Sequence, residues 1–394
     1  MKILLLSFYY PPDLCAGSFR AAALVDALLE TGGASVTVDV MTTRPNRYAS
    51  FVSQAAAVET APGLTIHRFQ LPSHEGGAGQ QAWSYLAYAN AVRVAIKSGT
   101  WDVVVATSSR LMTAALGAQV AKRVQARLYL DIRDLFTDTA SDVFQGLAAR
   151  IALPALHWLE RRTLRAADRI NAVSPAFVPY LKQRAPQQTY RVFANGIDEG
   201  FLSHDFAKPD RAPSSPRLIV YAGNMGEGQG LHCVLPKAAA LLGPETRFRL
   251  IGDGAKKSLL QSRLAAAGVT NVSLLPPLPR EQLYEHYREA DALFLHLNDH
   301  PAFRKVLPSK IFEYAATGKP IIAGASGLAA AFLENEVGGV ALFAPCDPAG
   351  MARAVASLDE MPSRMDRSVF RARYTRRDIM MRMAKDILAL GETG

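Results

Sequence analysis

The sequence has 394 residues, of which 49% are hydrophobic and 20% are charged. This composition excludes a disordered or fibrous chain, and the length predicts two globular domains rather than one compact core. The formal net charge of +9 favours anionic partners, and nucleotide phosphates, nucleic acid and anionic lipid all fit it.

The first twelve residues, MKILLLSFYYPP, carry a short apolar run that ends at two prolines. Such a run predicts a buried strand and not a signal peptide. No segment reaches the roughly 18 uncharged apolar residues that a membrane-spanning helix needs. The cysteines, Cys15, Cys233 and Cys346, form no CxxC or Cys/His pattern, so neither a disulfide framework nor a zinc site is predicted. We expect a cytoplasmic protein that meets a membrane only at its surface.

The first half of the chain alternates apolar runs with helical patterns, which predicts βαβ units and a mainly parallel sheet. Strands are expected at residues 2–7, 35–41, 64–69, 103–106, 127–131 and 169–172, and helices at 18–30 and 82–97. A polar, proline-rich stretch then interrupts the pattern. A second series of strands is expected in RLIVYAG, RFRLIGDG, NVSLLPP, ALFLHL, KPIIAG and GVALFAP.

These two series predict two similar α/β halves. We place an N-terminal Rossmann-like domain at residues 1–203, a linker at 204–216, a C-terminal Rossmann-like domain at 217–372 and a helical tail at 373–394. The tail carries an amphipathic helix that can pack back on the N-terminal domain. Ligands of open α/β sheets bind at the carboxyl ends of the strands, so we expect the two domains to face each other across a cleft.

Two loops of the first half are candidates for ligand contact. In YYPPDLCAGSFR at 9–20, Gly17 allows a ligand to approach the backbone, and the helix that follows offers free N–H groups to an anion. An ordinary strand-to-helix turn is the alternative. In DIRDLFTD, Arg133 and Asp134 follow a strand, as active-site residues often do, unless Arg133 merely pairs with Asp131 or Asp134.

In the second half, AGNMGEGQG at 222–230 has four glycines between a strand and a helical pattern. Backbone N–H groups of such a loop can wrap a diphosphate, and the next helix directs its positive end toward it. The loop is not a Walker A motif, because no GK[ST] follows, and it does not stand in the first βα turn as a dinucleotide fingerprint does.

The most informative segment is LPSKIFEYAATGKPIIAG at 307–324, which predicts a helix of about two turns with Ser309 as N-cap and Gly318 just past its end. Lys310 and Glu313 share one face of this helix. A cation in the first turn is unfavourable unless an anion such as a diphosphate neutralises it, and a carboxylate can accept both hydroxyls of a ribose. The alternative is a surface ion pair of little energetic weight.

Five segments follow one another along almost the whole chain: PPD…GS, RVFANGID, YAGNMG, LIGDG and PSKIFEYAATGKPII. In this order they resemble retaining glycosyltransferase family 4, which has the GT-B fold. Bacterial members that build O-antigen, capsule or exopolysaccharide look most similar. The resemblance implies an N-terminal acceptor domain and a C-terminal donor domain. It also implies metal-independent, retaining transfer from a nucleotide-diphosphate sugar to a glycan or lipid-linked acceptor, without a cofactor.

Several positions depart from the family pattern. Many members carry a glutamate pair spaced EX₇E; Glu313 matches the second, but Lys305 stands at the first. Asn224 and Gln229 replace the usual Arg and Lys of the phosphate loop, which leaves most phosphate charge to Lys310 and makes these two neutral hydrogen-bonding partners.

Arg133 stands where many members have a histidine, and with Asp134 it is expected to face the reacting sugar. The residues predicted to act in catalysis are therefore Arg133, Asp134 and Lys310. Those predicted to bind the donor are Gly17, Gly223, Asn224, Gly226, Gln229, Arg304, Lys305, Ser309, Lys310 and Glu313. No DxD motif occurs, so no carboxylate-held metal is predicted.

Other interpretations concern the partners. A catalytically silent homologue in a glycan assembly complex and a nucleotide-sugar epimerase share the expected fold and are the alternative functions. The stretch 147–165, rich in arginine and containing Trp158, either rests on an anionic membrane surface or is a surface helix with its apolar side in the core. Nucleic acid is not a predicted partner, because the basic residues are dispersed. His296, isolated from other candidates, is expected to be structural.

Overall fold

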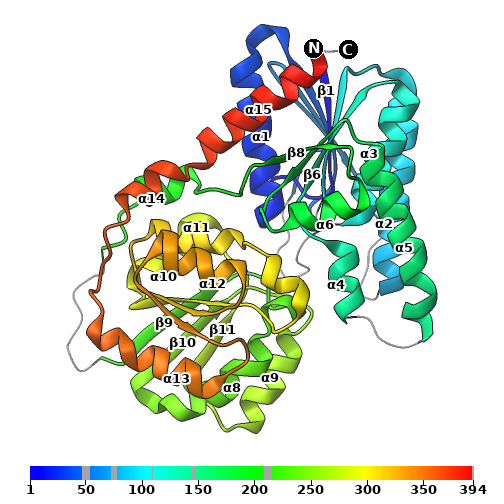
Figure 1. Ribbon diagram of the computed structural model, residues 1–394. Coiled ribbons are helices and arrows are strands. Elements are labelled where there is room, and N and C mark those ends of the chain that lie inside the picture. Colours follow the sequence, from blue (N-terminus) through cyan, green and yellow to red (C-terminus); the bar gives the residue numbers. More distant parts are fainter. Residues whose placement is uncertain (47–53, 72–77, 109, 144–146, 208–214, 393–394) are drawn as a thin grey trace. The chain divides into compact units, whose positions relative to one another are not determined.

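The computed structural model describes residues 1–46, 54–71, 78–108, 110–143, 147–207 and 215–392. The chain divides into two compact units: Met1–Asn195 with Arg377–Gly394, and Gly196–Arg376. Each unit is a mainly parallel sheet with helices on both faces (Figure 1). The predicted two-domain α/β architecture is thereby confirmed.

The sheet of the first unit has the strand order β3-β4-β2-β1-β5-β6-β7-β8. Its strands are β1 (Lys2–Ser7), β2 (Thr37–Thr43), β3 (Val58–Ala61), β4 (Leu64–Phe69), β5 (Val103–Ser108), β6 (Arg127–Ile132), β7 (Arg169–Ala172) and β8 (Thr189–Val192). Only β3 runs antiparallel to its neighbour. The sequence pattern did not predict β3 and β8, because both are short and mostly exposed edge strands that need no apolar run.

Helices of the first unit lie on both faces of this sheet. They are α1 (Ala16–Gly32), α2 (Ala78–Ala95), α3 (Leu111–Val124), α4 (Phe136–Val143), α5 (Leu147–Arg165), α6 (Phe177–Arg184) and the tail helix α15 (Arg376–Glu392). Figure 1 shows α1 and α15 on one face and α2 and α3 on the other. Alternate residues of β1, Ile3 and Leu5, share a core with Leu28 of α1 and Met383 of α15, so the tail helix is part of the first unit.

The chain passes from the first unit to the second at Asn195/Gly196 and returns at Arg376/Arg377. The predicted boundary at 203 falls inside the second unit, and residues 208–214 of the predicted linker lie outside the described residues. The helix α7 (Glu199–Ser203) belongs to the second unit because its Phe201 ring packs edge-on against Tyr284, with centroids 5.0 Å apart.

The second unit has the strand order β11-β10-β9-β12-β13-β14. Its strands are β9 (Arg217–Ala222), β10 (Thr246–Ile251), β11 (Val272–Leu275), β12 (Ala292–His296), β13 (Ile321–Gly324) and β14 (Val340–Phe343), and each coincides with one predicted apolar run. Its remaining helices are α8 (Leu231–Leu242), α9 (Lys257–Ala266), α10 (Arg280–Glu289), α11 (Ser309–Ala316), α12 (Leu328–Phe332), α13 (Pro348–Ala356) and α14 (Ser368–Arg373). The first two and α13 pack on one face, while α10 and α11 lie on the other (Figure 1).

Candidate functional site

The glycine loop joins β9 to α8 and stands at the carboxyl end of a central strand. It spans residues 223–230, and the loop after β10 packs against it without intervening side chains. A Cβ atom at Gly252 would lie 2.0 Å from the carbonyl oxygen of Gly223, and one at Gly254 about 2.6 Å from the backbone of Met225. Met225 donates its N–H to the Asp253 carbonyl at 2.8 Å. The two loops therefore form one rigid edge.

Lys310 lies over this loop. Its Nζ would be 2.5 Å from a Cβ atom at Gly223, whose φ is +137°, and it stands 5.1 Å from the ring centroid of Tyr221. Glycine is thus required at 223 for its backbone conformation and for the space that the lysine occupies. The structure brings together Lys310 and Gly223, two residues that the sequence assigned to the same site.

Asn224 and Gln229 close the loop upon itself. The Gln229 Oε1 atom accepts hydrogen bonds from Asn224 Nδ2 at 2.8 Å and from the N–H of Gly226 at 3.3 Å. These amides are neutral, as expected, but in this conformation they brace the loop. Beyond them, Gly230 adopts a left-handed φ of +55° and α8 begins without a side-chain cap, which leaves its positive end available to an anion.

His296 supports the same loop from β12. Its Nδ1 atom lies 2.6 Å from the carbonyl oxygen of Gln229, and its Nε2 atom is 2.9 Å from the backbone N of Cys346. The carbonyl must accept and the N–H must donate, so the imidazole is neutral with its proton on Nδ1. Burial lowers the pKa of His296 to about 4. The predicted structural role is confirmed, and the residue holds the glycine loop in place.

The helix α11 begins one residue earlier than its predicted cap implies. Pro308 is the N-cap, with φ −70° and ψ 145°, and its carbonyl accepts the N–H of Ile311 at 3.2 Å. Ser309 is already helical, so the prediction that it caps the helix is wrong. An N-cap needs extended backbone, which proline adopts readily. At the other end Gly318 has a φ of +74°, as predicted for the residue past the helix.

Glu313, one turn after Lys310, has a side chain only 15% exposed and lies 3.5 Å from a guanidinium nitrogen of Arg280. Burial raises the pKa of Glu313 and Asp198 adds to this, whereas Arg280, Arg376 and Lys310 oppose it. Arg280 is not among the predicted site residues, because no local pattern links it to Glu313, 33 positions away.

Two further predicted donor residues lie on the turn that precedes α11. Arg304 is mostly exposed, with its guanidinium 3.4 Å from the carboxylate of Asp299. Lys305 is the last residue of the same 3₁₀ turn, Pro301–Lys305. An exposed pair of this kind is screened by water, so its electrostatic interaction is weak.

In the first unit the structure brings Gly17 and Arg133 together. The Arg133 Nη1 atom would be 2.2 Å from a Cβ atom at Gly17, so only glycine leaves room for this guanidinium. The neighbouring Asp134 is exposed. Desolvation by the surrounding protein raises the pKa of its carboxyl, while Arg133 and a hydrogen bond with the Leu135 backbone oppose this.

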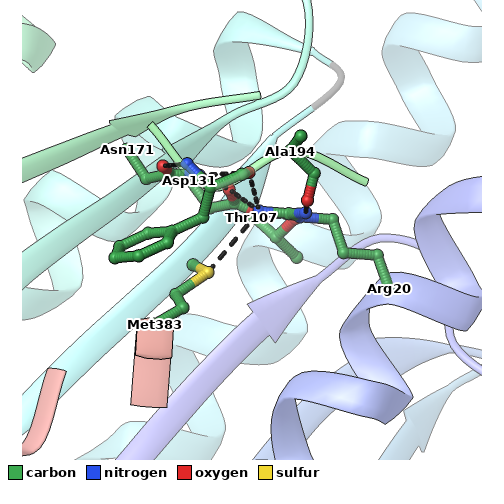
Figure 2. Close-up of polar contacts among 7 residues, drawn as sticks. Arg20, Thr107, Asp131, Asn171, Ala194 and Met383 are labelled. Carbon is green, nitrogen blue, oxygen red and sulfur yellow. Dashed lines mark hydrogen bonds and ion pairs between the residues drawn. The ribbon is translucent and has the colours of Figure 1, made fainter. Parts of the chain in front are cut away.

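Asp131 pairs with Arg20 of α1, whereas the sequence suggested Arg133 as its possible partner. Figure 2 shows Arg20 of α1 reaching the carboxylate of Asp131, with Nε–Oδ2 and Nη2–Oδ1 distances of 2.9 Å each. Thr107 and Asn171 donate to the same carboxylate at 3.0 and 2.7 Å. This cluster was missed, because its members lie on four different elements.

The part of the chain that the structure describes contains no group of three or more His, Cys, Asp or Glu side chains arranged to hold a metal ion. None of its helices combines the length and the apolar character that crossing a membrane requires.

Two family models match the chain. The glycosyl transferase 4-like domain matches residues 18–196, and glycosyl transferases group 1 matches residues 216–360. Among curated proteins, the chain is similar to the putative colanic acid biosynthesis glycosyl transferase WcaI of Escherichia coli, with 30% identity over 210 residues. That match covers 50% of this chain and 51% of the relative, so it spans about half of the relative's length.

A longer match joins the chain to the D-inositol 3-phosphate glycosyltransferase of Streptomyces griseus, 25% identical over 353 residues, which are 80% of this chain and 72% of the relative. Among solved structures, Anabaena HepE in complex with UDP-glucose superposes with a TM-score of 0.69 and 16% identity, covering 99% of this chain and 100% of that one. At that identity the likeness shows the fold alone.

Proposed function

This chain belongs to the glycosyltransferases, with a glycosyl transferase 4-like domain followed by a group 1 domain in a GT-B fold, and from that premise we propose that it moves a sugar from a nucleotide-diphosphate donor to an acceptor hydroxyl. The observation that carries the proposal is the Lys310 ammonium group placed over Gly223, at the loop that leads into α8.

The donor site is proposed on the second unit. The charge of Lys310, the backbone N–H groups of residues 223–226 and the N-terminus of α8 would stabilise the diphosphate, which gains negative charge as the sugar leaves. Glu313 would accept the ribose hydroxyls. Arg304 and Lys305 would add weaker, solvent-screened attraction. The complex of HepE with UDP-glucose supports this choice of donor class.

The proposed reaction retains the anomeric configuration and uses no metal ion. The bond from the anomeric carbon to the phosphate oxygen breaks, the bond from the acceptor oxygen to that carbon forms on the same face, and the acceptor proton passes to the leaving phosphate oxygen. Lys310 would supply the positive charge at the diphosphate. On the first unit, Arg133 and Asp134 would face the reacting sugar.

A glycan or lipid-linked acceptor of bacterial surface polysaccharide is the proposed acceptor. The name of the Escherichia coli relative, which refers to colanic acid biosynthesis, supports this class.

The donor proposal is tested by thermal shift and calorimetry with UDP, GDP, dTDP, CMP and their sugars, with and without EDTA. We expect one diphosphate to stabilise the wild type, to do so in EDTA, and to lose its effect in Lys310→Ala. The matched control is Lys237→Ala, an exposed lysine of α8 whose loss should change nothing. Binding that needs a divalent ion would contradict metal independence, and no binding at all would contradict the donor site.

Turnover separates the transferase from the two alternatives. With the bound nucleotide sugar, a transferase releases nucleoside diphosphate only when an acceptor is present, and an epimerase changes the sugar without an acceptor. A silent homologue binds the donor and does neither.

We also propose that α5 meets an anionic membrane. Its Trp158 is 59% exposed, the Arg162 guanidinium lies 5.3 Å from the Trp158 ring, and Arg161 and Arg165 are exposed nearby. A tryptophan among arginines suits the interface of an anionic bilayer. Vesicles with phosphatidylglycerol should bind the wild type, and Trp158→Glu should weaken this binding. Equal binding to neutral vesicles, or no effect of the substitution, would contradict the proposal.

A further inference from the structure

Arg280 lies between two carboxylates of the second unit. Its guanidinium forms a close ion pair with Asp198 and stands 3.5 Å from Glu313. The three side chains are 18%, 13% and 15% exposed in that order. The group is therefore shielded from bulk water, while some of its surface can still be reached by a ligand.

Asp198 has a second, independent anchor. Arg376 donates to its carboxylate and, through Nη2, to the carbonyl of Gly196 at 3.1 Å. The backbone N–H of Arg376 donates to the Ile197 carbonyl at 2.7 Å. Asp198 is thus fixed where the outgoing and returning chain segments pair, so the position of Arg280 does not depend on Glu313.

The two carboxylates differ in what remains for a ligand. Asp198 contacts both guanidinium groups at close range, whereas Glu313 has one ion-pair partner among the described residues, at 3.5 Å. An ionised carboxylate has about four acceptor positions. Glu313 therefore keeps more of its hydrogen-bonding capacity than Asp198, whose two oxygens each contact one guanidinium.

We propose that Arg280 is a positioning residue, which orients the Glu313 carboxylate to accept hydrogen bonds from the hydroxyls of the donor's ribose, while Asp198 holds Arg280 in place. The inference rests on the proposed donor site. Arg280 itself need not touch the donor, because it acts through the Glu313 carboxylate.

The charges around Glu313 predict in which direction each substitution should shift its pKa. Burial raises the pKa of Glu313, and Arg280 is the largest opposing influence, ahead of Arg376 and Lys310. Three tyrosines interact electrostatically with the Glu313 carboxyl, and burial raises the pKa of each above its usual value of 10, so they remain neutral; they are Tyr284, Tyr287 and Tyr314.

Removing Arg280 should therefore raise the pKa of Glu313 further. Replacing the Asp198 carboxylate by the amide of asparagine removes the like charge but keeps an oxygen that can accept from Arg280, so it should lower the pKa of Glu313. The two substitutions act on the same carboxyl in opposite directions.

The experiment compares a ribonucleoside diphosphate with its 2′-deoxy form, using the base that binds the wild type best. Calorimetry from pH 6 to 9 gives the ratio of the two affinities, in which titration of the phosphate cancels. We expect the wild type to prefer the ribose form by about 10- to 100-fold, since a hydrogen bond to a charged group is lost in the deoxy form. Arg280→Gln should reduce the preference to below about threefold at pH 6 and recover part of it as the pH rises.

Further variants exclude a merely structural effect. Asp198→Asn should extend the ribose preference to lower pH, and Glu313→Gln should abolish its pH dependence. Arg288→Gln, the same change at a half-buried position of α10, should behave as the wild type. Circular dichroism checks folding, and if Arg280→Gln does not fold, Arg280→Lys and Asp198→Asn carry the test.

The outcomes separate this inference from the donor site. A wild type that binds no diphosphate contradicts the proposed function. A wild type that binds both forms equally, or an Arg280→Gln or Arg280→Lys variant with unchanged preference and pH profile, overturns the role of Arg280 and leaves the donor site standing.

Discussion

Asp131 of the first unit and Glu313 of the second are both shielded carboxylates, and they differ in how far their oxygens are satisfied. Asp131 accepts two hydrogen bonds from Arg20 and one each from Thr107 and Asn171, all within 3.0 Å. Burial alone would raise the pKa of Asp131, but Arg20, Arg133 and Asn171 lower it overall. Glu313 has one ion-pair partner among the described residues, Arg280 at 3.5 Å, and a raised pKa.

This difference distinguishes a carboxylate that holds the fold from one that is available to a ligand. The Asp131 cluster joins α1, three strands and the segment before the unit boundary, since Arg20 also donates to the carbonyls of Phe193 and Ala194 (Figure 2). All acceptor positions of its carboxylate are occupied. A charged residue at a strand end therefore indicates a binding site only when its partners leave capacity unused.

The largest effect is expected from a substitution that breaks the Asp131 cluster. Asp131→Ala leaves the Arg20 guanidinium buried without its partner and should destabilise the first unit by about 3–5 kcal/mol. The control is Glu30→Ala, which removes an exposed ion pair between α1 and α15 and should cost less than about 1 kcal/mol. Chemical unfolding followed by circular dichroism measures both. Similar losses in the two variants would contradict the distinction.

The two units should differ in their stability at acidic pH. The folded-state pKa of His296 is about 4, against 6.5 in the unfolded chain, so the stability that its neutral ring contributes is complete above about pH 6.5 and is lost as the pH falls toward 4. The loss amounts to about 2–3 kcal/mol. The pKa of Asp131 is lowered, so its contribution persists until the pH falls below about 3.8.

Hydrogen exchange at pH 7 and pH 4.5 measures the stability of each unit separately. We expect the glycine loop and β12 to lose protection first, and His296→Gln, which lacks the titrating ring, to reduce this pH dependence. If β6 of the first unit lost protection at a higher pH than these segments, the expected order of acid destabilisation would be contradicted.

A smaller effect is expected from a substitution in the glycine loop, for which the chain offers a matched control. Gly223→Ala strains a backbone with φ +137° and pushes Lys310 aside, so diphosphate affinity should fall by about 10- to 100-fold. Gly243→Ala strains a backbone with φ +63° where nothing lies within 4 Å, and should lower stability without changing affinity. Calorimetry and thermal melting give the two quantities. Equal affinity losses would show that strain, and not Lys310, is responsible.

The smallest effect is expected at Arg304. Because its side chain is exposed and already close to Asp299, Arg304→Ala should lower diphosphate affinity by no more than about threefold. The dependence of affinity on salt should decrease slightly. A loss as large as that of Lys310→Ala would mean that Arg304 moves onto the diphosphate when the donor binds.

Much of the candidate site follows from local chemistry. Gly223 and Lys310 were both predicted, because a glycine after a strand and a lysine in the first turn of a helix are unusual in themselves. Ser309 was placed wrongly by one position, since a serine and a proline both satisfy the local rule and only backbone geometry decides which one caps. Arg280, Asp198 and Arg20 carried no local signal, because an arginine on a helix is ordinary until its partner is known.

The sequence by itself determined the alternation of strands and helices, the positions where only glycine fits, and hence the two-domain α/β class. The tertiary structure alone decided which charges meet. Arg20 and Asp131 are 111 residues apart, and their contact depends on the placement of β6 two strands from β1. The unit boundary at Asn195 was likewise set by where Phe201 packs and not by the polar segment that follows. Periodicity acts within one element, whereas pairing depends on the order in which elements assemble, and that order is not contained in any local pattern.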